Sequence, residues 1–128
     1  MKRILLDTHV LLWWLSDDPR LGSEARGLVG DAANSIHVSA ASTWEIAIKQ
    51  GAGKVTAPDD LDGIVDREGF EKLPISLYHG QQAGRLPLLH RDPFDRMLIA
   101  QAQAEGLDIL TADEQIPRYG VHTIDAGR

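Results

Sequence analysis

Short apolar runs alternate with amphipathic stretches along the whole of this 128-residue chain, and this alternation restricts the fold more than any other feature. The runs that we expect to be strands are 3–7, 35–40, 73–76, 107–111 and 121–124. The stretches that we expect to be helices are 10–15, 23 onward, 42–50, 58–69, 77–86 and 92–105. Helices that separate successive strands are typical of a parallel sheet. Because no linker or repeat divides the chain, the sequence predicts a single α/β domain over residues 1–128.

The composition excludes several classes of protein. The chain has no cysteine, which excludes disulfides, thiolate metal sites and thiol nucleophiles and fits a reducing compartment such as the cytoplasm. It has no apolar run of the roughly 20 residues that a membrane-spanning helix needs. Its 19 acidic residues against 13 Lys or Arg give a net charge of −6. That charge argues at first sight against nucleic acid as a partner, and it excludes tight, nonspecific binding through a basic face.

Four acidic residues lie inside apolar segments, whereas most of the other acids fall in polar stretches. Asp7 follows the first predicted strand, and Asp113 follows the predicted strand at 107–111. Glu45 and Asp95 each lie in the first turn of a predicted helix. In a parallel sheet, strands end and the returning helices begin at the same edge. The sequence therefore predicts that the four carboxylates converge at that edge.

Each of these acids also has an ordinary structural explanation. Asp7 can cap the helix that follows it. Glu45 has Lys49 four residues later, and a surface ion pair of this kind contributes only ~0.3–0.5 kcal/mol. Asp95 near a helix N-terminus is favoured by the helix dipole, and Asp113 can open a turn. It is the convergence of all four that points to chemistry.

A cluster of carboxylates needs something to neutralise it. Two carboxylates ~4 Å apart repel by about 4 kcal/mol at an effective dielectric constant near 20. Oxygen ligands without cysteine or paired histidines favour Mg²⁺ or Mn²⁺ over zinc. Such ions commonly activate water and stabilise the charge of an in-line phosphoryl displacement. The cluster thus predicts phosphodiester hydrolysis.

Four blocks of the sequence resemble PIN-domain nucleases, in particular the VapC-type toxins of bacterial type II toxin–antitoxin pairs. The blocks occur in the order of that family and span almost the whole chain. They are LLDTHVLLWWL at 5–15, STWEIAIK at 42–49, HRDPFDRMLIAQA at 90–102 and ILTAD at 109–113.

The resemblance implies a three-layer α/β/α fold with a central parallel sheet of about five strands. It implies an endoribonuclease that depends on Mg²⁺ or Mn²⁺ and acts on RNA in the cytoplasm. It also implies a small VapB-like antitoxin that blocks the site, a homodimer, and possible assembly into larger toxin–antitoxin complexes.

By this resemblance Asp7, Glu45, Asp95 and Asp113 are the catalytic and metal-binding acidic quartet. Asp7 and Asp95 would ligate the main ion, while the other two complete the site or hold a second ion. Water activated by the metal would attack the phosphorus and leave a 5′-phosphate. The resemblance also gives three accessory positions, Asp92, Thr111 and His9. Three basic residues flank the acid-bearing segments, and we expect them to contact the RNA backbone: Lys49, Arg91 and Arg96.

Two other classes of protein remain as alternatives. A receiver-type phosphoacceptor domain has a similar length and also binds Mg²⁺ through carboxylates, but it needs adjacent acids after the first strand, where this chain has Asp7 and Thr8. A catalytically silent α/β interaction module is the other alternative, and it predicts that removal of the acids changes little.

Overall fold

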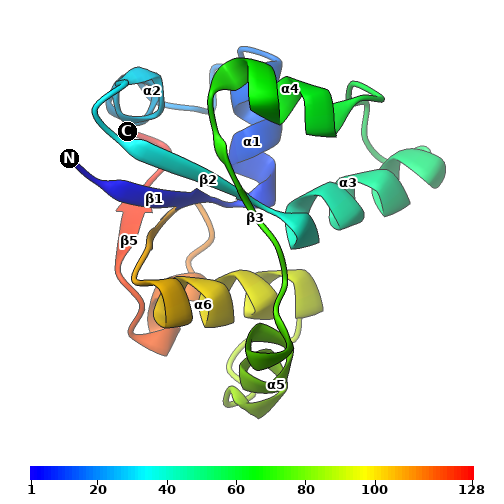
Figure 1. The fold of residues 1–128 in the computed structure, drawn as a ribbon, viewed down its shortest axis with the longest axis vertical. Coiled ribbons are helices and arrows are strands. Elements are labelled where there is room, and N and C mark those ends of the chain that lie inside the picture. The colour runs from blue at the N-terminus through cyan, green and yellow to red at the C-terminus, as the bar shows by residue number, and fades with distance from the viewer.

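A five-stranded, wholly parallel sheet forms the centre of the computed structural model, which describes residues 1–128 (Figure 1). The order of the strands across the sheet is β3-β2-β1-β4-β5. The strands are β1 (Arg3–Leu6), β2 (Ser35–Ser39), β3 (Glu71–Leu73), β4 (Asp108–Thr111) and β5 (Thr123–Asp125). The predicted parallel sheet of about five strands is confirmed.

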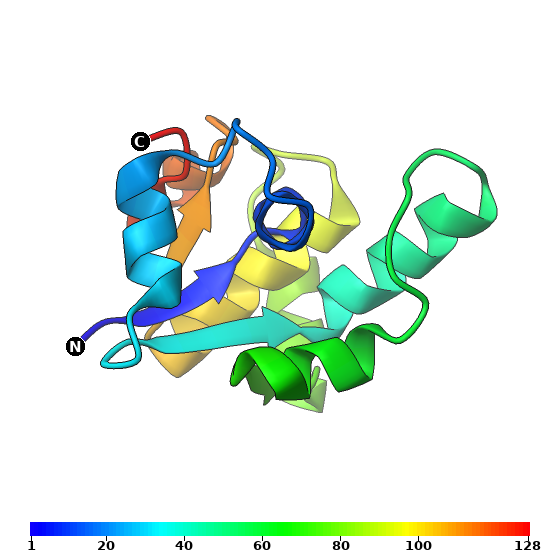
Figure 2. The same ribbon diagram turned by 90° about the horizontal axis from the view of Figure 1, so that it is seen from above.

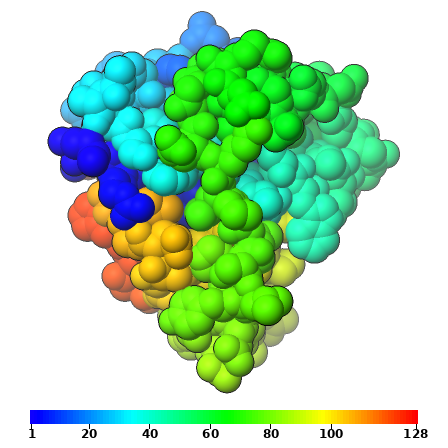
Figure 3. Space-filling view, viewed as in Figure 1, coloured from blue at the N-terminus to red at the C-terminus, as the bar shows by residue number.

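Helices cover both faces of the sheet, as the three-layer prediction required (Figures 1 and 2). They are α1 (Thr8–Leu15), α2 (Ser23–Gly30), α3 (Ala40–Gly51), α4 (Leu61–Glu68), α5 (Leu77–Arg85), α6 (Pro93–Glu105) and the 3₁₀ helix η1 (Ile116–Tyr119). Helices α1, α2 and α4 lie on one face, while α5 and α6 lie on the other. The chain from α4 through β3 to α5 crosses the visible face of the molecule as one green band (Figure 3). No helix is long and apolar enough to cross a membrane.

The alternation of side chains along β1 divides the hydrophobic core into two clusters. Ile4 and Leu6 point into the cluster beneath α1, α2 and α4. Leu5 points into the cluster beneath α6, together with Leu98 and Ile109. Successive side chains of a strand point to opposite faces, so β1 is buried on both sides and anchors the edge from which the site is built.

Several boundaries differ from the predicted ones for local reasons. Strand β3 lies at Glu71–Leu73 and ends before Pro74, which has no N–H to donate to the ladder. Ser76 belongs to the next helix, because its hydroxyl accepts a hydrogen bond from the His79 N–H as the N-cap of α5. Helix α2, in contrast, begins at Ser23 as predicted, and Gly22 is its N-cap.

Helix α6 begins and ends as predicted. The Asp92 side chain accepts hydrogen bonds from the N–H groups of Phe94 at 2.8 Å and Asp95 at 3.1 Å, which satisfies two of the free donors of the first turn. Gly106 ends the helix with a φ of 67°, a left-handed conformation that favours glycine. These ends fix the register of α6 and therefore the position of Asp95.

Arg96 fastens the segment between α5 and α6. Its guanidinium donates hydrogen bonds to four backbone carbonyls and a tyrosine hydroxyl, and the residue is only 8% exposed. The acceptors are the carbonyls of Ala83, Leu86, Pro87 and His90 and the hydroxyl of Tyr119, at 2.9–3.3 Å. With both terminal amino groups of its guanidinium hydrogen-bonded to the protein, Arg96 does not fit the predicted contact with RNA, and we assign it this structural role instead.

We expect Arg96→Lys to lower the free energy of unfolding by about 2–3 kcal/mol, because one ammonium group cannot reach acceptors spread around a planar guanidinium. Denaturant unfolding of the purified protein measures the change. Arg85→Lys is the matched control, since Arg85 is exposed on the same helix–loop segment. Equal stability of the two variants would contradict the role given to Arg96.

Candidate active site

The strand order creates a crevice at one edge of the sheet. From β1 the chain adds β2 and β3 on one side, and later returns to add β4 and β5 on the other. Ligand sites of open parallel sheets lie at such a reversal, beyond the carboxyl ends of the strands. Asp7 directly follows β1, and Asp113 lies two residues after β4. Helices α1, α3 and α6 begin at this same edge (Figure 1).

Asp7 is buried and turned toward β4. It is the N-cap of α1 by position, but its carboxylate makes no capping hydrogen bond. Instead Oδ2 accepts a hydrogen bond of 2.6 Å from the Thr111 hydroxyl, and the residue is only 4% exposed. Burial raises the pKa of Asp7, against the opposing effects of the Thr111 hydrogen bond and of His9. Thr111 thus orients the carboxylate of Asp7.

Asp95 is a buried acid whose ionisation the site perturbs strongly. Its pKa is raised to about 7, first by burial and then by the negative charge of Asp7, with smaller contributions from Asp92 and Asp113. A hydrogen bond with His90 opposes this rise, with Nε2 of the imidazole 2.7 Å from Oδ2 of Asp95. Asp7, Asp92 and Asp113 are thus close enough to affect the ionisation of Asp95.

Asp113 completes the group on the side of β4. Its Oδ2 lies 3.4 Å from Nε2 of His90, and its Oδ1 accepts a hydrogen bond from the Gln115 N–H at 2.8 Å. Its own N–H donates to the Thr111 hydroxyl at 3.0 Å, so Thr111 connects Asp113 to Asp7. One ligand atom each from His90, Asp95 and Asp113 lies within 4.8 Å of the others, a spacing that could hold a metal ion.

Glu45 is buried, whereas its spacing from Lys49 suggested an ion pair on the surface. Lys49 does contact it, with Nζ 2.5 Å from Oε2, but Glu45 is only 2% exposed and its Oε1 has no hydrogen-bond partner. A hydrogen bond of 2.9 Å between the hydroxyls of Thr8 and Ser42 joins the starts of α1 and α3. It places the helix turn that carries Glu45 beside the one that follows Asp7.

The secondary predicted positions divide into structural and accessible ones. Asp92 caps α6. His9 is exposed and packs near the Trp13 ring, with ring centroids 6.5 Å apart. Arg91 is exposed, and about a third of the Lys49 side chain is exposed.

His90 is the site residue that sequence reasoning missed. Its imidazole lies between Asp95 and Asp113, and the charges of these acids and their hydrogen bond outweigh burial and raise its pKa. One feature of the sequence could have identified His90 as a site residue. It lies two residues before the Asp-Pro start of α6, at the edge where the acids were expected to converge.

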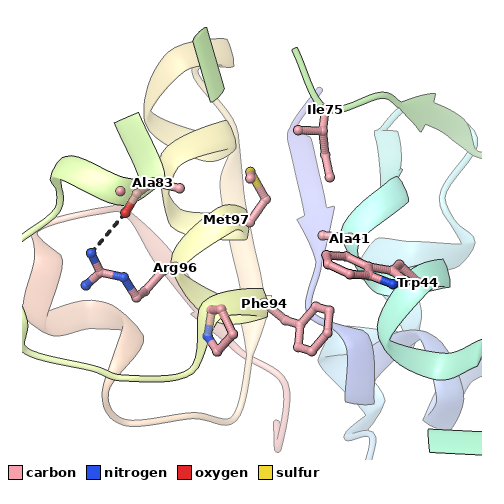
Figure 4. Close-up of a pocket in the computed structure, with 9 residues that line it drawn as sticks. Ala41, Trp44, Ile75, Ala83, Phe94, Arg96 and Met97 are labelled. Atoms are coloured by element: carbon pink, nitrogen blue, oxygen red, sulfur yellow. Dashed lines mark hydrogen bonds between the residues drawn. The ribbon is translucent and has the colours of Figure 1, made fainter. Parts of the chain in front are cut away.

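An apolar cleft of about 260 Å³ lies beside the acids, between α3 and α6 (Figure 4). The rings of Trp44 and Phe94 meet edge to face across it, with centroids 5.1 Å apart. Trp44 is 60% exposed, and Ile75 closes the cleft toward α5. Trp44 and Phe94 directly precede Glu45 and Asp95 in the chain, so the cleft adjoins the acidic site.

The sequence and the fold match a known domain family. The model of the PIN domain family matches residues 4–121, and the chain belongs to that family. Ribonuclease VapC16 of Mycobacterium tuberculosis is 41% identical over 73 residues, which are 52% of this chain and 52% of that protein. The match therefore covers about half the length of this curated relative.

Solved structures show the same fold. VapBC2 of Rickettsia felis, bound to a DNA fragment from its promoter, has a TM-score of 0.70 at 18% identity, over 95% of this chain and 97% of that one. DNA-bound VapBC of Salmonella typhimurium has a TM-score of 0.69 at 21% identity, over 98% of each chain.

We expect Asp95→Asn to stabilise the metal-free protein increasingly as the pH rises. A carboxyl with a folded-state pKa of about 7, above its usual value of 3.8, binds more protons when the protein is folded. The free energy of unfolding therefore falls as the pH rises from about 4 to 7. The advantage of the variant should grow by on the order of 2 kcal/mol from pH 5 to pH 8. Denaturant unfolding in EDTA measures it.

Glu114→Gln is the matched control, because it removes a neighbouring but exposed carboxylate. Stability of Asp95→Asn below that of the wild type throughout this pH range would refute the crowding of charge at Asp95.

Proposed function

We propose that residues 1–128 form one nuclease domain, a VapC-type endoribonuclease toxin that depends on a divalent cation. Membership of the PIN family and the buried aspartates at the sheet edge support this proposal. The meeting of buried Asp7 and Asp95 with Asp113 at one edge of the sheet is the observation that carries it, because buried carboxylates grouped in this way suit a site whose charge a cation offsets. The 41% identity with a ribonuclease over 73 residues supports the choice of RNA as substrate.

The donors present fit Mg²⁺ or Mn²⁺. They are carboxylate oxygens, the ligands that both ions prefer, and the Glu45 Oε1 has no partner in the protein. Asp7 and Asp95 would hold the ion, with Asp113 and Glu45 completing the site. Once bound, a divalent cation supplies Lewis acidity that favours ionisation of water and offsets charge at the phosphorus.

The protein's own residues position the reactants. Thr111 holds the Asp7 carboxylate toward β4, and the cap by Asp92 fixes the start of the helix that carries Asp95. Lys49, with its Nζ on the Glu45 carboxylate, and the exposed Arg91 would contact the RNA backbone. Without a cation, Asp95 retains a proton near neutral pH, so the site is most anionic when an ion is present to balance it.

We further propose that the partner is a small VapB-like antitoxin that covers the site. The structures of similar fold are VapBC complexes, which supports this class of partner. The apolar cleft beside the acids offers an exposed indole and a phenyl ring to a protein segment (Figure 4). An RNA substrate and such a partner also suit the cytoplasm.

The predicted homodimer remains part of the proposal. The apolar helix α1 is a candidate for the contact, but its Leu11 is buried in the core. Three half-buried residues of α1 pack against that core and are the ones still available for a homodimer contact: Leu12, Trp14 and Leu15. Light scattering of the purified protein decides the oligomeric state.

Inducible expression in a bacterium tests the function. Wild type should arrest growth and produce discrete cuts in total RNA, whereas Asp95→Asn, which removes an ion ligand, should do neither. Purified Asp95→Asn should cleave RNA at least about 100-fold more slowly.

Glu24→Gln, an exposed acid on α2, is the control and should behave as wild type. Equal growth of wild type and Asp95→Asn, together with no cleavage by the purified wild type with Mg²⁺ or Mn²⁺, would refute the proposal and favour an interaction module.

A further inference from the structure

His90 adds a nitrogen atom to a site otherwise made of oxygen ligands. Its Nε2 lies 2.7 Å from Oδ2 of Asp95 and 3.4 Å from Oδ2 of Asp113. The imidazole therefore contacts two carboxylates that belong to different elements, the start of α6 and the segment after β4. A cation that bridges these carboxylates meets this nitrogen as well.

The spacing of the three atoms suits ligands of one ion. Metal–ligand bonds of about 2.1–2.2 Å in an octahedron place neighbouring ligand atoms roughly 3 Å apart. The two distances from Nε2, 2.7 and 3.4 Å, lie on either side of that value. Small movements of the acid side chains are enough to convert these contacts into an ion's ligand shell.

The backbone of His90 is held independently of the acids. Its N–H donates to the Tyr119 hydroxyl at 2.8 Å, and its carbonyl accepts from Arg96 at 3.3 Å. Arg96 also fastens the neighbouring carbonyls of Leu86 and Pro87. The imidazole is thus presented to the site by a fixed segment, which lowers the entropy lost when it binds an ion.

We propose that His90 is a ligand of the catalytic cation and makes the site prefer a first-row transition ion such as Mn²⁺ over Mg²⁺. The inference rests on the proposed function and deepens it, since it names the ion that the same site selects. Imidazole nitrogen suits transition metals, whereas Mg²⁺ strongly prefers oxygen. An all-carboxylate site would lack this means of discrimination.

Metal binding to the intact protein tests the proposal without any need for activity. Free Mn²⁺ is followed by electron paramagnetic resonance, and Mg²⁺ binding by its competition with Mn²⁺. The wild type should bind Mn²⁺ more tightly than Mg²⁺. The resonance signal of its bound Mn²⁺ should show modulation by the ¹⁴N nucleus of the His90 imidazole. His90→Gln, which offers an amide at a similar reach, should lose the modulation, weaken Mn²⁺ about tenfold or more, and change Mg²⁺ less than threefold.

Two further variants separate the possible failures. His90→Ala should give the same loss of preference, and thermal unfolding in EDTA checks that each variant is folded. Asp95→Asn should weaken both ions. Two outcomes would overturn the role of His90 alone. One is a His90→Gln variant whose Mn²⁺ affinity is unchanged, with no ¹⁴N modulation in the wild type. The other is a His90→Gln variant that loses affinity for Mn²⁺ and Mg²⁺ equally. Failure of wild type to bind either ion would overturn the proposed function itself.

Discussion

Crowding of carboxylates at one edge of the sheet is the constraint on which the rest of the structure depends. Burial raises the pKa of both Asp7 and Asp95, and the charge of Asp7 raises that of Asp95 further, so a fold that holds them together gives up stability in the absence of a cation. The surrounding contacts keep these groups from moving apart. Thr111 connects Asp7 to the segment after β4, and the Thr8–Ser42 hydrogen bond joins α1 to α3.

The two-sided core provides the rigidity that this edge requires. The central strand β1 is buried on both faces, by α1, α2 and α4 on one side and by α6 on the other. Its carboxyl end therefore cannot shift without loss of packing in both clusters. Arg96 extends this rigidity to a segment without regular structure, and its hydrogen bonds fix the backbone of His90 as firmly as a helix would. A catalytic geometry is thus held partly by packing and partly by a single guanidinium.

Local patterns predicted the fold well, because strand alternation, the Asp92 cap and the glycine stop act within a few residues of sequence. The structure brings Asp95 close to Asp7 and Asp113, while Glu45 is paired with Lys49. The environments of individual side chains were harder to predict from the sequence. Lys49 four residues after Glu45 suggested a surface pair, and only packing of α3 shows that Glu45 is buried. Arg96 in a charged motif suggested a contact with RNA, although its acceptors lie on a segment up to 13 residues away. His90 stood alone in a polar segment, and its partners come from two elements.

The acid excess that first argued against nucleic acid has a local explanation under the proposed function. A net charge of −6 repels phosphate as a whole, yet the repulsion that matters is that of the acids at the sheet edge. Two divalent ions would bring the net charge to about −2 and would place positive charge where a phosphate must approach. Cation and RNA would then favour each other's binding, because each reduces the charge that the other meets. The same acids that exclude nonspecific binding of nucleic acid thereby make its binding conditional on the metal.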